Sequence, residues 1–208
     1  MTKLVYIKPV KAGLTIICVG AYFLIICLSI RIYKADVNYK KARALFTSGQ
    51  SVAGLEKINK AINYNPYEPS YYRERAKLYL STTVTQEYLA KQKLKELAYN
   101  NLNRSIDLNP NNLASIRNAI PNYYFLTVED LANPEGANNI DETYYKDVVK
   151  ILEETKKTYP ADLGVQILIA SYENKLGLKN EKKETLEAIE ILRPDVLEWH
   201  PKLLLLKN

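Results

Sequence analysis

Apolar residues recur at intervals of three and four along much of the chain, the spacing that places them on one face of an α-helix. Leu55, Ile58 and Ile62 make one such stripe. Asn65-Pro66 ends it, because the residue before a proline avoids the α-helical region. Similar stripes follow in segments 86–108, 141–158, 161–176 and 180–192. The pattern therefore predicts an all-α chain of amphipathic helices separated by turns.

One stretch near the start departs from this pattern because it is apolar on every side. Residues 12–30 carry no charge, and as a helix they would be about 28 Å long, close to the ~30 Å hydrocarbon core of a bilayer. We therefore expect a transmembrane helix over residues 12–32, preceded by a basic tail at 1–11. The alternative is a cleaved signal peptide. Against it, the run exceeds the usual apolar length of about 7–15 residues, and no small-x-small cleavage site follows.

The formal net charge of +6 is distributed unevenly. Residues 1–34 contain five Lys or Arg and no acid, whereas the rest of the chain has 24 cations and 23 acids. A nucleic-acid-binding domain needs a basic face on its folded part, so we expect no nucleic-acid partner. Cations are slightly more numerous after the apolar run than before it. Because positive charge marks the cytoplasmic side, this slightly favours a cytoplasmic location for residues 35–208.

Glycine, proline and capping residues predict where individual helices begin and end. Gly49 predicts a turn between helices over 35–47 and 51–64. Asp141 is placed to cap a helix that runs to residue 158. Pro121 is expected to kink or split a helix in the least regular part of the chain, because proline removes a backbone donor.

The pairing of these helices resembles the tetratricopeptide repeat (TPR) family, whose unit is two helices with small residues at their crossing and a closing proline. The matching residues are Ala42, Leu45, Ile58, Ala61 and Pro66, then Tyr72, Ala76, Tyr79, Ala98, Leu102, Ser105 and Pro110, then Ala170, Gly177, Leu186, Ile189 and Pro194. The interval from Pro160 to Pro194 equals the family's period, whereas the two earlier intervals between closing prolines are longer and imply insertions. The resemblance implies a TPR-like α-solenoid of antiparallel helix pairs over residues 35–208. The alternative is an unrelated helical bundle with proline-terminated helices.

In TPR proteins the first helix of each pair lines a concave groove that holds partners. The residues matched to that face, here called the cationic row, are Tyr39, Arg43, Arg73, Lys77, Arg117 and Tyr124. Their charge favours a protein partner with an acidic segment, or an anionic polymer. The row lacks the lysine–asparagine pattern of the members that clamp peptide carboxylates, since Tyr39 and Glu74 stand at two of those places. An ordinary mixed surface is the alternative.

The sequence contains none of the catalytic, phosphate-binding or zinc-binding motifs considered next. The sequence has no Gly-rich phosphate loop, no Gly-x-Ser-x-Gly and no histidine pair for zinc. His200 is the single histidine, and we expect it to pack within the last helix. Cys18 and Cys27 both lie in the apolar run, so no metal site or disulfide framework is expected. Adjacent charges are expected to be solvated at Glu153-Glu154, Lys156-Lys157 and Lys182-Lys183. We therefore expect neither an enzyme nor a bound cofactor.

A second, looser resemblance concerns the order of the elements. An apolar helix, the basic link Tyr-Lys-Ala-Asp at 33–36 and the segment NPYEPSYYRERAKLYL at 65–80 look like the C-terminal end of some bacterial O-antigen ligase and polymerase proteins. Those enzymes keep their chemistry in many earlier membrane spans. The sequence thus predicts a non-enzymatic, membrane-anchored adaptor or scaffold that binds a protein partner. The alternative is an accessory or detached part of a surface-polysaccharide assembly system. The oligomeric state is left open.

Overall fold

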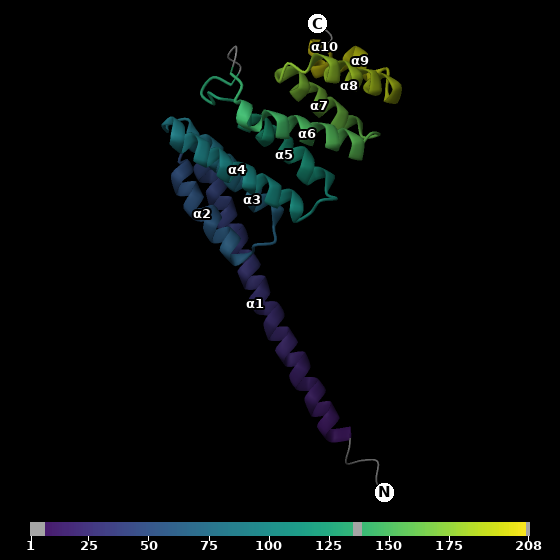
Figure 1. Ribbon diagram of the computed structural model, residues 1–208. Helices are drawn as coiled ribbons and strands as arrows, with labels where there is room; N and C mark the ends of the chain where they lie inside the picture. Colours follow the sequence, from purple (N-terminus) through teal and green to yellow (C-terminus); the bar gives the residue numbers. More distant parts are fainter. Residues whose placement is uncertain (1–6, 135–138, 207–208) are drawn as a thin grey trace. The chain divides into compact units, whose positions relative to one another are not determined.

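The computed structural model describes residues 7–134 and 139–206, and these residues form helices and no strand (Figure 1). The all-α prediction is therefore confirmed for this part of the chain. The chain divides into two compact units, Met1–Tyr67 and Glu68–Asn208, which are described separately. The helices are α1 (Ile7–Thr47), α2 (Ser51–Tyr64), α3 (Pro69–Thr83), α4 (Tyr88–Asp107), α5 (Leu113–Leu126), α6 (Glu142–Thr158), α7 (Leu163–Lys175), α8 (Lys179–Leu192), α9 (Val196–Trp199) and α10 (Pro201–Leu206).

Helix α1 is unbroken over 41 residues, as Figure 1 shows. From Gly13 to Thr47 it is long and apolar enough to cross a membrane, and no residue of its most apolar window is buried. The sequence predicted a membrane helix that ends at residue 32 and a separate helix from residue 35. The structure joins the two, because residues 31–46 contain neither glycine nor proline to end a helix. Of the predicted basic tail, residues 1–6 lie outside the described part of the chain.

The C-terminal part of α1 packs along α2 within the first unit. Gly49 has a φ of +76°, a left-handed conformation that favours glycine, and Gln50 donates its backbone N–H to Leu45 O at 2.8 Å. The turn therefore ends α1 and starts α2 at the residues that the sequence predicted. Ala42 on α1 and Ala61 on α2 have no exposed surface.

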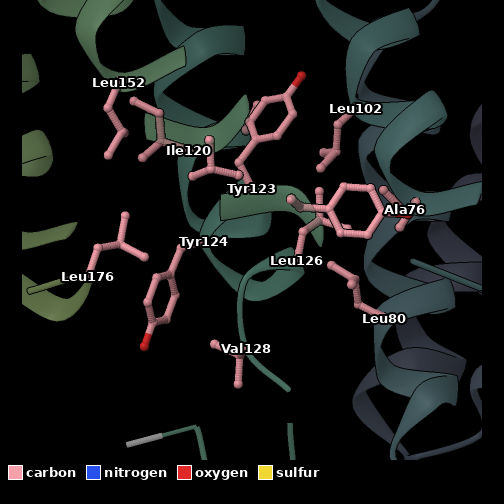
Figure 2. Packing of buried hydrophobic residues seen from close by; sticks show 14 of the residues in the cluster. Ala76, Leu80, Leu102, Ile120, Tyr123, Tyr124, Leu126, Val128, Leu152 and Leu176 are labelled. Carbon is pink, nitrogen blue, oxygen red and sulfur yellow. The ribbon is translucent and has the colours of Figure 1, made fainter. Parts of the chain in front are cut away.

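In the second unit each helix from α3 to α9 packs against the next one along the chain, and α10 packs against both α9 and α7 (Figure 1). Helix α5 is central, because it packs against α3, α4, α6 and α7. Its residues Ile120 and Leu126 lie in one buried cluster with Leu102 of α4 and Leu152 of α6, as Figure 2 shows. Pro121 was expected to kink or split a helix, and it does not split one, because α5 runs continuously from Leu113 to Leu126 with Pro121 inside it.

Two junctions between helices, α4 to α5 and α6 to α7, have the same hydrogen bonds. Asn112 accepts a hydrogen bond from the backbone N–H of Ser115 at 3.0 Å, and Asp162 accepts one from Val165 at 2.8 Å. Each capping residue also donates its own N–H to the carbonyl three positions earlier, at 3.2 Å in both cases. Both helices therefore begin in the same way after the helix that precedes them.

The end of the unit is closed by α9 and α10. Leu203 and Leu206 of α10 are buried with Val196 and Leu197 of α9 and with Ala170 of α7. Within this cluster the apolar side chains of α9 and α10 are removed from water.

Candidate functional site

Two residues of the predicted cationic row, Tyr39 and Arg43, lie on α1 in the first unit. The Arg43 guanidinium carbon is 5.8 Å from the centre of the Tyr39 ring, within the range of a cation–π contact. The structure thus brings these two side chains together. The other four residues of the row belong to the second unit, so a continuous strip through all six stays a prediction.

Arg73 and Arg117 occupy equivalent places on α3 and α5, at the fifth position of each helix. Arg73 donates a hydrogen bond from Nη1 to the Ser115 hydroxyl of α5 at 3.2 Å. The Arg117 guanidinium covers Gly164 of α7, where an added Cβ would lie 2.5 Å from Nη2. Each arginine therefore reaches from its own helix to the first turn of the next one in the order α3, α5, α7.

The last two residues of the row have other neighbours. Lys77 Nζ lies 3.8 Å from the carboxylate of Glu74, which is buried on the same helix. Tyr124 is buried, its ring lies 5.2 Å from that of Tyr172, and Lys175 Nζ is 5.3 Å from its centre. Figure 2 shows its hydroxyl pointing away from that of the adjacent Tyr123. Tyr124 therefore contributes to packing between α5 and α7.

The second unit also carries two surface grooves that the sequence did not predict. The first groove, of about 280 Å³, lies between the C-terminal ends of α4 and α6 and the first turns of α5. The second groove, of about 520 Å³, lies between the C-terminal end of α6, the start of α7 and helix α8. Their linings correspond position by position as Asn103 and Glu153, Ile106 and Lys156, Asp107 and Lys157, Pro110 and Pro160, Ile116 and Gln166, Ile151 and Glu181, Glu154 and Glu184, Thr155 and Thr185, and Thr158 and Ala188. In each of the first five pairs, the two residues are separated by the same number of positions in the sequence. The last four pairs share a second, shorter separation. The two grooves are therefore lined by equivalent positions of successive helices.

The first groove has an apolar floor that includes one buried phenol. The Tyr123 hydroxyl donates a hydrogen bond to Asn103 Oδ1 at 2.8 Å. Burial raises the pKa of Tyr123 above its ordinary value, and the nearby Tyr99 and Asp107 raise it further. The ring therefore stays neutral, and the ionised groups of the groove are the carboxylates of Asp107 and Glu154.

The second groove contains a buried ion pair instead. Lys156 Nζ donates to Glu173 Oε1 at 2.6 Å and to the Thr185 hydroxyl at 3.2 Å. Glu173 is only 1% exposed and stands on α7 at the place that Tyr123 takes on α5. Its other oxygen, Oε2, has no hydrogen-bond partner among the residues that the structure describes. The prediction that Lys156 is solvated is wrong, because the carboxylate of α7 draws it into the interior. Nothing local to Lys156 in the sequence could signal this contact.

A second buried ion pair holds α6, the helix shared by both grooves. Lys95 Nζ of α4 donates to Asp141 Oδ2 at 2.6 Å and to Val128 O at 2.7 Å. Asp141 also accepts the backbone N–H of Thr143 at 3.0 Å, which confirms it as the cap of α6. Burial raises the pKa of the Asp141 carboxyl, but the hydrogen bonds from Lys95 and Thr143 outweigh burial and hold the pKa below its ordinary value. The sequence pointed to the cap but not to its distant partner on α4.

Within residues 7–134 and 139–206, no three His, Cys, Asp or Glu side chains are grouped so that they could hold a metal ion. His200 lies between α9 and α10, with its ring 5.9 Å from that of Trp199. No protein-family model, no curated protein and no solved structure matches this chain, so the functional argument rests on its own residues.

Proposed function

We propose that this chain is a non-enzymatic, single-pass membrane protein that holds a protein partner next to the membrane. Helix α1 is the observation that carries the proposal. Its N-terminal part is apolar and exposed, while its C-terminal part packs against α2 in the same unbroken helix. Apolar side chains that are exposed along a helix of this length are stabilised when the hydrocarbon core of a bilayer surrounds them. A helix that continues into a folded pair favours a retained anchor over a cleaved signal.

The remaining helices are proposed to form a TPR-like solenoid. Three repeated features support regular stacking: the two junctions with the same caps, the arginines that reach to the next helix, and the equivalent linings of the two grooves. An irregular bundle gives no reason for these positions to recur. Stacked helix pairs present extended surfaces to partners, which supports a role in protein binding.

The partner is proposed to present an acidic segment to Arg73 and Arg117, and the domain is proposed to lie in the cytoplasm. The two arginines stand at the fifth position of α3 and of α5, and a guanidinium group matches a carboxylate in geometry. The cytoplasmic location is proposed because cations follow the apolar run at positions 31–43, and positive charge marks the cytoplasmic side of a membrane helix. A membrane-impermeant maleimide on Ser48→Cys, in a chain with Cys18→Ser and Cys27→Ser, tests it in sealed cells. Labelling without permeabilisation would overturn the cytoplasmic assignment.

The anchor is tested by washing membranes that contain the full chain at alkaline pH. The chain is expected to stay in the membrane fraction, because the apolar run is integral. The variant Phe23→Lys, Leu24→Lys is expected to be released, since each lysine in the middle of a span costs about 2.5–3.5 kcal/mol. Tyr88→Lys, Leu89→Lys is the matched control, because both side chains are exposed outside the run. Release of the parent chain, or recovery of a chain that starts after Ile30, would refute the anchor.

The adaptor function is tested by cross-linking the tagged full chain in membranes and identifying the linked peptides after extraction. A protein partner linked to α3, α5 or α7 is expected. Its yield should fall with Arg73→Gln, Arg117→Gln, while circular dichroism shows the parent's helix content. The function would be rejected if no protein links to the second unit above the level seen with an unrelated single-span control.

A further inference from the structure

The first groove combines an apolar floor with a rim of negative charge. Four isoleucines contribute to it from three different helices, and no lysine or arginine is among its lining residues. The residues that matter here are Ile106, Ile116, Ile120 and Ile151 on the floor, with Asp107 and Glu154 on the rim. A surface of this kind attracts a group that is both apolar and cationic.

The rim carboxylates are available for a ligand. Asp107 is exposed and has no ion pair or hydrogen bond through its side chain with any residue in 7–134 or 139–206. Glu154 lies 3.8 Å from Lys150, but both side chains are more than 60% exposed, and such a pair is weak. In the second groove Lys156 is bound to Glu173, and Lys157 lies 3.9 Å from Glu153. The lining of the second groove therefore carries lysines as well as carboxylates, whereas the lining of the first carries carboxylates alone.

We propose that the first groove binds a lysine side chain presented by the protein partner. The methylene groups of the lysine lie over the isoleucine floor, and its ammonium group lies between Asp107 and Glu154. The volume of about 280 Å³ suits one long side chain and not a large ligand. The inference rests on the proposed function in one respect: the lysine side chain is supplied by a protein partner.

This contact has the opposite sign to the cationic row and uses different residues. The Tyr123 hydroxyl faces Asn103 of the groove, while the hydroxyl of Tyr124 in the cationic row points away from it (Figure 2). A partner that uses both surfaces would therefore need an acidic and a basic segment. The lysine site can be tested without knowing that partner.

The probe is capped lysine, Nα-acetyl-lysine methylamide, added to the full chain in phosphatidylcholine nanodiscs. Methyl NMR of isoleucine, threonine and alanine reports on both grooves, because the first has isoleucine methyls and the second has Thr185 and Ala188. Capped lysine is expected to shift the isoleucine methyls of the first groove. Capped norleucine, with nearly the same shaft and no charge, should bind about three- to tenfold more weakly, and capped glutamate should not bind.

The variant Asp107→Asn, Glu154→Gln is expected to weaken lysine binding by about three- to tenfold. Each single variant gives part of that loss, and an unchanged methyl spectrum in the absence of the probe shows that the fold is intact. Glu184→Gln is the matched control, because Glu184 occupies the place of Glu154 in the second groove. Equal binding of lysine and norleucine, unchanged affinity in the double variant, or shifts confined to Thr185 and Ala188 would overturn the proposal. Such a result would leave the adaptor function standing, which the cross-linking experiment tests on its own.

Discussion

The two grooves of the second unit share their backbone positions but differ in chemistry. The first places an isoleucine and a tyrosine at positions 106 and 123, where the second places a lysine and a glutamate at 156 and 173. The turns that set the two junctions are alike, with Pro110 and Asn112 matching Pro160 and Asp162. The two grooves thus share their turn and cap residues and their backbone positions, while the side chains that line them differ.

The difference also changes what holds each groove together. In the first groove, folding removes isoleucine side chains from water, and the buried Tyr123 hydroxyl donates a hydrogen bond to Asn103. In the second, Lys156 and Glu173 must give up their hydration, and one carboxylate oxygen has no partner among the described residues. A buried pair of this kind is costly to break from one side, but contributes little compared with well-packed apolar residues. The second groove is therefore the more sensitive one to loss of a single charge.

The largest effect on stability is expected from a substitution that loosens α6, the helix that lines both grooves. Asp141→Ala removes the buried partner of Lys95 and the cap of α6 together. We expect the free energy of unfolding to fall by about 3–5 kcal/mol, because Lys95 is left as a buried charge with only Val128 O to accept from it. Urea unfolding of the full chain in micelles measures this. Asp147→Ala on the exposed face of α6 is the control, expected within about 0.5 kcal/mol of the parent.

The same pair predicts acid sensitivity. Because the folded pKa of Asp141 lies below its ordinary value of 3.8, its stabilising contribution is present above that value. It is lost as the pH falls through the folded pKa, since the unfolded chain takes up the proton first. The parent should thus lose stability on acidification, and Asp141→Asn should flatten the slope. Equal slopes would show that the pair with Lys95 is not formed in solution.

The next effect separates the two grooves directly. Lys156→Met leaves the Glu173 carboxylate buried without a counter-ion, and we expect a loss of about 3 kcal/mol. Ile106→Met, at the equivalent position of the first groove, should cost less than about 1.5 kcal/mol. Hydrogen exchange in α6 and α7 reports the loss locally. Lys156→Met with Glu173→Gln should recover most of the stability, and failure to recover it would mean that the two side chains do not act as a pair.

A smaller effect is expected at Tyr123 in the first groove. Tyr123→Phe removes the hydrogen bond to Asn103 and should cost about 1 kcal/mol. The folded pKa of Tyr123 lies above its ordinary value of 10.0, so its contribution is complete below that value and is lost as the pH rises toward the folded pKa. Alkaline unfolding should therefore be less steep in Tyr123→Phe. Tyr159→Phe, which also removes a hydroxyl from a groove tyrosine, is the matched control.

Features that depend on neighbouring residues could be predicted from the sequence. Gly49 gave the turn after α1, Asp141 gave the cap of α6, and the spacing of apolar residues gave Leu102 as core. Pro121 does not split α5, because the packing of this helix against four others holds it together despite one missing backbone donor. The grooves could not be predicted, because each is built from three helices.

The ion pairs were missed for the same reason. Lys95 and Lys156 look like ordinary surface lysines in the sequence, and only the fold shows that their carboxylates come from other helices or helix ends far along the chain. A charged side chain is buried when a distant partner is fixed opposite it, and periodicity carries no information on that partner. The prediction of solvated charges is confirmed for Lys157, which is exposed beside Glu153.

The smallest effect is expected at Gly164, the residue of α7 that Arg117 covers. The equivalent residue of α5, also the second of its helix, is the exposed Ala114. Gly164→Ala gains helix propensity, up to about 1 kcal/mol in a helix interior and less in a first turn. The new Cβ would meet the end of the Arg117 side chain, which can rotate away at small cost because it is flexible. We therefore expect a net stabilisation of about 0.5 kcal/mol by thermal unfolding, with Ala114→Gly giving a loss of similar size. A clear destabilisation by Gly164→Ala would instead show that the guanidinium is held in place, and that the link from α5 to α7 is rigid.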